Sequence, residues 1–201
     1  MADTKERILR TALRLFARDG YEAVSVSDIA GELGITKGAL YRHYRNKRAI
    51  FDSILARMAQ RDAEAACAHD LPEGTPEEMG EAYRAASLDD AVGFAKAMFR
   101  YWTQDEFAAM FRRMLTLEQF RSTEMGALYQ QYLAAGPVGY MADLFAGLGL
   151  PRPREAAVEF YAPMYLLISA YDGAADGAAI LALADGLLES AGARLKEERE
   201  G

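Results

Sequence analysis

The stretch KGALYRHYRNKRAIF, residues 37–51, holds five basic side chains, two tyrosines and one of the two histidines of the chain. The 201-residue chain as a whole is acidic, with a formal net charge of −7. Residues 1–50 carry a net charge of +4, so the remainder carries −7 minus +4, or −11. A basic segment on an acidic chain indicates a polyanionic partner, although a solvated charged surface is the ordinary alternative on charge alone.

Two short helices joined by a tight turn at Gly34 are predicted around this stretch. Ser25 and Asp28 form an S-x-x-D capping box, which opens a helix that runs to about Leu33. Thr36 is a suitable N-cap for a second helix that ends near residue 43. Helices this short are marginal in isolation, so this pair needs longer neighbours.

Two longer helices are predicted on either side of the short pair. The first covers residues 4–19 and stops at Gly20, and the second runs from residue 47 to about 66 after Asn46 as its cap. Both carry an apolar stripe at helical spacing. Two short helices packed on two long ones make a helix-turn-helix arrangement.

The chemistry of the second short helix suits DNA. Gly38 lets the backbone approach a phosphate or base edge, and Lys37 can donate to guanine in the major groove. Tyr41 and His43 can donate to phosphate oxygens, and Lys47 adds a compact charge beside them. The alternative for Tyr41 is a core aromatic, and the alternative for His43 is a helix-end histidine without a ligand.

Residues 4–55 resemble the TetR (tetracycline-repressor) family of bacterial transcriptional regulators. The resemblance rests on the combination "A..LF...G" with "S..DIA..LGI..G.LY.HY..K..IF" at this spacing. It implies that Lys37 and Arg42 are base readers and that Tyr41 and Lys47 are phosphate contacts. The positions that it implies as DNA-contacting are Ser27, Thr36, Lys37, Gly38, Tyr41, Arg42, His43 and Lys47. Tyr44 is expected in the core, and Arg45 and Arg48 are expected to be solvated charges.

The fold expected for the whole chain is all-α, with about nine to ten helices. Residues 1–47 are expected to form the DNA-binding domain and residues 48–201 an effector-binding and dimerisation domain. The clearest break in the sequence is 70–80. The remaining helices are predicted at about 76–86, 88–103, 105–119, 123–134, 138–148, 153–171 and 178–198.

The last two helices are expected to form a homodimer interface. The resemblance implies such a dimer, and residues 153–171 are apolar nearly all round. The final helix carries an apolar stripe, and two such helices from each subunit can make a four-helix interface. The stripe comprises Ile180, Leu183, Ala184, Leu187, Ala191 and Leu195. The alternative is an ordinary core within one chain, and both are expected to hold in part.

The resemblance also implies a small-molecule effector bound in the central region, which is dense in large, soft side chains. The expected effector is hydrophobic or amphipathic, in a largely apolar cavity with a few polar groups. Its candidate residues are Phe99, Trp102, Phe107, Met110, Phe111, Met114, Gln119, Tyr129, Tyr161 and Tyr165. A stripe of Met and aromatic residues at helical spacing is, however, more often plain core than a ligand site.

An enzyme is disfavoured because the sequence has none of the G-x-S-x-G, P-loop, G-x-G-x-x-G or H-E-x-x-H motifs. No catalytic residue, metal site or cofactor is predicted, and Cys67 and His69 alone do not make a metal site. The single cysteine and the absence of a signal peptide or membrane-length apolar run favour a cytoplasmic protein without membrane attachment. A ligand-released repressor is the primary expectation, while a ligand-dependent activator and a helical adaptor protein remain alternatives.

Overall fold

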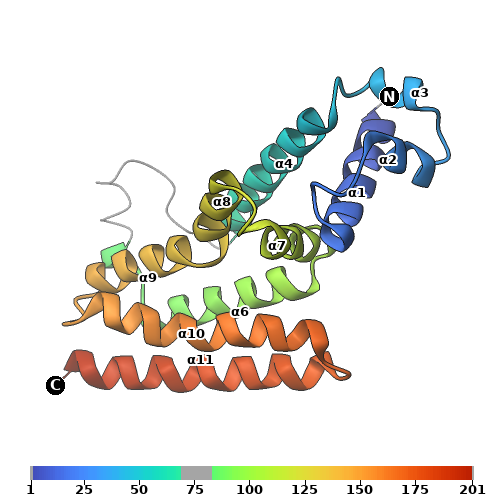
Figure 1. Cartoon of the computed structure of the whole chain (residues 1–201). Helices are drawn as coiled ribbons and strands as arrows, with labels where there is room; N and C mark the ends of the chain where they lie inside the picture. The colour runs from blue at the N-terminus through green and yellow to red at the C-terminus, as the bar shows by residue number, and fades with distance from the viewer. Residues whose placement is uncertain (1, 69–82, 201) are drawn as a thin grey trace. The chain divides into compact units, whose positions relative to one another are not determined.

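The computed structural model describes residues 2–68 and 83–200, and these residues form helices with no strand. The all-α prediction is therefore confirmed. The helices (Figure 1) are α1 Ala2–Asp19, α2 Val26–Glu32, α3 Lys37–Tyr41, α4 Lys47–Ala68, α6 Leu88–Gln104, α7 Glu106–Glu118, α8 Thr123–Leu133, α9 Ala135–Gly147, α10 Pro153–Gly173 and α11 Gly177–Glu200. The predicted helix 76–86 and the break at 70–80 fall mainly outside the described residues, as does His69, and the Cys67 side chain is not described.

The described residues divide into two compact units, and neither is a single continuous stretch of chain. The first unit contains the residues up to Glu64 together with Glu106–Tyr129. The second contains Ala65–Asp105 and the residues from Gln130 onward. The helix-turn-helix therefore shares a unit with α7, which lies about sixty residues further along the chain than the helix-turn-helix itself.

The core of the first unit is built from the apolar faces of α1, α4 and α7. Phe16 of α1, Phe51 of α4 and Phe111 of α7 are all fully buried. The ring of Tyr21, in the turn after α1, lies 5.1 Å from Phe16 and 5.0 Å from Phe51. Helix α1 packs against α7 within this unit (Figure 1). These long helices supply the support that α2 and α3 need.

The starts of the short helices follow the predicted capping chemistry. The Ser25 side chain accepts from the Asp28 N–H at 3.2 Å, and the Asp28 carboxylate accepts from the Ser25 N–H at 2.8 Å. Thr36 Oγ1 accepts from the Ala39 N–H at 3.1 Å. A second capping box joins Ser87 and Asp90 at the start of α6. Helix α3 is shorter than predicted, because it ends at Tyr41 and the Tyr44 N–H then bonds back to the Leu40 carbonyl.

We expect the two capping carboxylates to make stability fall in acid. The hydrogen bonds from Ser25 and Ser87 lower the pKa of Asp28 and Asp90 below the ordinary value of 3.8. Their contribution is therefore complete above that value and is lost as pH falls through the lowered pKa. The Asp28→Asn/Asp90→Asn variant should lose less stability than the unmodified protein between about pH 6 and about pH 3. Urea unfolding at both pH values measures this, and equal losses in the two proteins would contradict it.

Three ion pairs tie α6 to α11 in the second unit. Asp89 pairs with Lys196 at 2.7 Å, Lys96 with Glu189 at 2.5 Å, and Arg100 with Asp185 at 2.6 Å. As the residue number rises on α6 it falls on α11, so the two helices are antiparallel and in a fixed register. Helix α10 packs between them and α9, where the rings of Phe145 and Phe160 meet edge to face at 5.5 Å.

Helix α9 begins at Ala135, about three residues before its predicted start near 138, so that only Ala134 separates it from α8. Pro137 is the third residue of α9. Proline is tolerated in the first turn because an N–H there has no intrahelical acceptor. Among the described residues, no helix has both the length and the apolar character that spanning a bilayer requires.

The predicted apolar stripe of the last helix is partly buried and partly exposed in the single chain. Ala184, Ala191 and Leu195 are buried together with Leu188, which the prediction omitted. Leu183 and Leu187 are instead 49% and 40% exposed. The predicted stripe is therefore buried within the chain only in part, and its Leu183 and Leu187 edge faces solvent in the single chain.

Candidate nucleic-acid interface

The predicted DNA-reading side chains of α3 are exposed. Lys37, Gly38 and Arg42 are open to solvent, and Tyr41 is 45% exposed. The Lys37 ammonium lies 5.9 Å from the centre of the Tyr41 ring, so the two side chains lie over the same part of the surface. An added Cβ at Gly38 meets only Thr36 Oγ1, at 4.0 Å, so packing within the chain does not require a glycine there. This leaves close approach of a partner as a reason for Gly38.

The opposite side of α3 anchors it to the unit. Leu40 is fully buried and Tyr44 is buried, which confirms the core interpretation of Tyr44. Burial raises the pKa of the Tyr44 hydroxyl. His43 is half-buried after the end of α3, where its N–H donates to the Leu40 carbonyl. Because the inward side is fixed, the outward side of α3 is presented in one orientation.

The other two predicted contacts lie at the edges of this surface. Ser27 is exposed and is the second residue of α2, which begins at Val26 after the N-cap Ser25. Thr36 is exposed too, but its hydroxyl oxygen already accepts from the Ala39 N–H. The Thr36 hydroxyl hydrogen remains available to an acceptor such as a phosphate oxygen.

Lys47 has partners within the chain that the sequence did not reveal. Its ammonium donates to the Tyr21 carbonyl at 2.7 Å and to the Glu22 carbonyl at 3.3 Å. It also lies 4.3 Å from the centre of the Tyr21 ring, a cation–π distance. An ammonium has three donors, so one remains for a phosphate.

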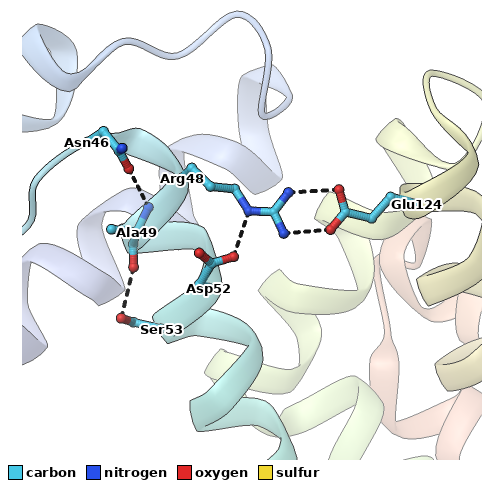
Figure 2. Close-up of polar contacts among 6 residues, drawn as sticks. All are labelled: Asn46, Arg48, Ala49, Asp52, Ser53 and Glu124. Atoms are coloured by element: carbon cyan, nitrogen blue, oxygen red, sulfur yellow. Dashed lines mark hydrogen bonds and ion pairs between the residues drawn. The ribbon is translucent and has the colours of Figure 1, made fainter.

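Arg48 is not the freely solvated charge that we predicted. It makes a two-bond fork with Glu124 of α8, at 2.7 and 2.8 Å, and bonds Asp52 at 2.6 Å (Figure 2). The Arg48 hydrogen bonds lower the pKa of Glu124. Both side chains are about half exposed, so the pair contributes no more than about 1 kcal/mol. Asn46 caps the same helix end by accepting from the Ala49 N–H at 2.8 Å, as the sequence predicted.

Six of the ten predicted effector residues belong to the first unit. Four of them, Phe107, Met110, Phe111 and Met114, lie on α7 and are buried where this helix packs against its unit. The remaining two, Gln119 and Tyr129, lie just after α7 and on α8. The Gln119 amide donates to the Thr116 carbonyl, and Tyr129 is buried.

The other four predicted effector residues belong to the second unit. Phe99 and Trp102 are buried on α6, and Tyr161 is buried on α10 with its hydroxyl donating to the Leu133 carbonyl at 2.8 Å. Tyr165 is 45% exposed one turn further along α10. A shallow groove lies between α10 and α11, and its lining includes Phe160 and Leu195. None of the ten predicted effector residues lines this groove.

The N-terminal helices match known proteins. Residues 8–54 match the profile of the family described as bacterial regulatory proteins, tetR family. An HTH-type transcriptional regulator of Bacillus subtilis, YerO, is 48% identical over 50 residues, which are 25% of this chain and 17% of that protein. The tetracycline repressor protein class C of Escherichia coli is 31% identical over 97 residues, which are 48% of this chain and 40% of that protein. The match thus spans less than half the length of either relative.

The likeness of fold extends over nearly the whole chain. A TetR-family transcriptional regulator of Mesorhizobium loti superimposes with a TM-score of 0.62 over 96% of both chains, at 18% sequence identity. The fold and the exposed short helix therefore define an all-helical protein with an N-terminal helix-turn-helix. Residues 8–54 thus match the N-terminal domain of the tetR family, and the fold of the chain is that of TetR-family structures.

Proposed function

We propose that the protein is a cytoplasmic transcriptional regulator that binds palindromic operator DNA as a homodimer. The observation that carries the proposal is the division of α3 and the turn after it into a buried anchor and an exposed basic side. Leu40 and Tyr44 hold the helix, while Lys37, Gly38, Tyr41 and Arg42 face solvent. Donors on one rigid helix are what reading a major groove requires.

Each exposed group has a role in this proposal. Lys37 and Arg42 read base edges, because long cationic side chains can donate to guanine O6 and N7. Tyr41, His43 and Lys47 donate to phosphates and fix the register of the protein on the duplex, with Ser27 and Thr36 beside them. Residues 1–47 form the reading domain, and residues 48–201 carry dimerisation and effector binding.

The exposed apolar residues of α10 and α11 support the homodimer. Leu166 is 68% exposed, and Val158, Tyr165, Leu183 and Leu187 are also open to solvent. On each helix they recur at spacings of four, seven or eight residues, which places them along one side. Two such helices from each of two copies make a four-helix interface that removes this surface from water.

Regulation in this proposal is a shift between two populations. One state holds the two copies of α3 about 34 Å apart, to match successive major grooves. A small hydrophobic or amphipathic effector favours a state with another spacing, and the shift is limited by its differential affinity for the two states. Repression released by the effector is the primary mode, and ligand-dependent activation by the same fold is the alternative.

The experiment that tests DNA binding is fluorescence anisotropy on DNA flanking the gene of this protein and on random DNA. A regulator should prefer one duplex, and its binding should weaken steeply with salt because phosphate contacts release counterions. A helical adaptor protein would show no binding even at low salt. If the flanking DNA gives no preference, selection from a random library supplies the operator.

The base-reading role of Lys37 has its own expected result. Lys37→Ala should lower the ratio of operator to random-DNA affinity by roughly tenfold, because a base contact is worth about 1–3 kcal/mol. Arg84→Ala, which removes an exposed charge from the second unit outside α10 and α11, is the control and should keep the ratio. An equal loss on operator and random DNA would remove Lys37 as a reader.

Effector binding is tested through the only tryptophan of the chain. Trp102 is buried on α6, so a ligand that enters the apolar interior of its unit should change its emission. Hydrophobic and amphipathic compounds should be screened for a saturable change that also alters DNA binding. A fluorescence change without an effect on DNA affinity would identify a ligand but not an effector.

A further inference from the structure

The turn that follows α1 is held from two sides by charged side chains. On one side, Lys47 at the start of α4 donates to the carbonyls of Tyr21 and Glu22. On the other side, Glu118 at the end of α7 accepts from the Tyr21 N–H at 3.0 Å. The same residue, Tyr21, thus offers its N–H to a carboxylate and its carbonyl to an ammonium.

The carboxylate of Glu118 is unusual because it is buried: the side chain is only 1% exposed. Carboxylates are almost never fully buried without a partner. Its partners are the Tyr21 N–H and, at 3.5 Å, Arg121 of the loop after α7. The turn also makes room for it: a Cβ at Gly20 would lie 2.5 Å from the carboxylate oxygen. The turn and the carboxylate are therefore fitted to each other.

We propose that Glu118 is a positioning residue for DNA binding. By accepting the Tyr21 N–H it holds the Gly20–Tyr21 peptide group, and so sets where the Tyr21 carbonyl, in the next peptide group, meets the Lys47 ammonium. This inference rests on the proposed function and deepens it. Lys47 uses two donors on the turn and keeps one for a phosphate, so the position of the turn sets the direction of that third donor.

The ring of Tyr21 makes the link stiff. It packs on Phe16 and Phe51, and the Lys47 ammonium lies over its face. A hydrogen bond to a buried, charged acceptor is stronger than one between neutral groups. Without Glu118 the Tyr21 N–H loses its acceptor and the Gly20–Tyr21 peptide group is no longer held. The Tyr21 carbonyl that follows it is then no longer fixed for the Lys47 ammonium.

The test measures the salt dependence of binding to a duplex selected from a random library by the unmodified protein. Lys47→Ala should lower the slope of log affinity against log salt by about 0.9 for each phosphate that the variant no longer neutralises. Glu118→Ala should lower this slope toward the value of the Lys47→Ala variant. The Lys47→Ala/Glu118→Ala double variant should have no lower slope than Lys47→Ala alone, because both residues act on the same phosphate. Glu118→Gln keeps an oxygen that accepts the Tyr21 N–H and should restore the slope.

Two variants separate positioning from stability. Leu115→Ala removes a fully buried side chain of the same helix that makes no polar contact with the turn, so it should destabilise the fold and leave the slope unchanged. Glu118→Met fills the site without an acceptor and replaces the alanine variant if that one does not fold.

The outcomes are distinct. A slope that Glu118→Ala or Glu118→Met leaves at the unmodified value overturns the positioning role and leaves the proposed function standing. Additive losses in the double variant overturn it too, because they show two independent effects. If the unmodified protein shows no salt-dependent binding to any duplex, both the proposed function and the role of Glu118 are wrong.

Discussion

Replacing Leu166 and Leu187 with glutamate should abolish tight operator binding while leaving the fold of each subunit intact. Both side chains are exposed in the single chain, so a charge there costs the monomer little. In the proposed dimer they are buried, and an unpaired carboxylate in an apolar interface is strongly unfavourable. A monomer reaches only one half-site and loses the effective concentration that links the two. We expect affinity to fall by about 100-fold or more.

Light scattering and anisotropy on the same samples measure this effect. Leu117→Glu is the matched control, since Leu117 is a leucine of α7 with 47% exposure that lies on neither α10 nor α11. The control should remain dimeric and bind normally. A double variant that stays dimeric at micromolar concentration would place the dimer interface elsewhere, and a monomeric one that still binds tightly would remove the two-half-site arrangement.

The local features of the DNA-binding region were readable from the sequence because their causes lie within a few residues. The Ser25–Asp28 capping box, the Thr36 and Asn46 caps and the glycine after α1 are each confirmed. Each depends on backbone groups that the helix itself leaves without partners, so spacing is enough to predict it. The burial of Tyr44 follows in the same way from the periodicity of a short helix.

Contacts between distant segments could not be read in this way. Arg48 pairs with Glu124, 76 residues away, and the Tyr21 N–H bonds Glu118, 97 residues away. In the sequence Arg48 stands among other basic residues, and Glu118 is one carboxylate among thirty acidic residues. The sequence holds one signal for the pairing of Tyr21 with Glu118, and it is recognised only once the structure is known. Glu118 is a carboxylate at an inward-facing position of an otherwise apolar helix face.

The candidate effector residues show a different limit. The i, i+3, i+4, i+7 stripe from Phe107 to Met114 correctly indicated a buried side of α7, although Ala108, Ala109 and Arg112 are buried as well. A core and a ligand cavity both require such a side, because both exclude water from apolar side chains. Periodicity indicates which side of a helix excludes water, but not whether other side chains or a ligand pack against that side. The effector residues therefore stay a prediction.

Gly20→Ala should destabilise the protein far more than Gly34→Ala, although both glycines have positive φ, at 89° and 67°. At Gly34 an added Cβ meets nothing within 4 Å, so the cost is the left-handed backbone alone, about 1–2 kcal/mol. At Gly20 the Cβ would also lie 2.5 Å from the Glu118 carboxylate. Moving that carboxylate breaks its bond to the Tyr21 N–H, which adds about 1–3 kcal/mol.

Urea unfolding of the single variants and of Gly20→Ala combined with Glu118→Ala separates these two costs. The backbone cost remains when Glu118 is absent, while the cost of close approach disappears. In the Glu118→Ala background, Gly20→Ala should therefore cost about the same as Gly34→Ala does in the unmodified protein. An undiminished cost in that background would mean that the backbone alone requires glycine at this turn, and that the fit between Gly20 and Glu118 contributes nothing to stability.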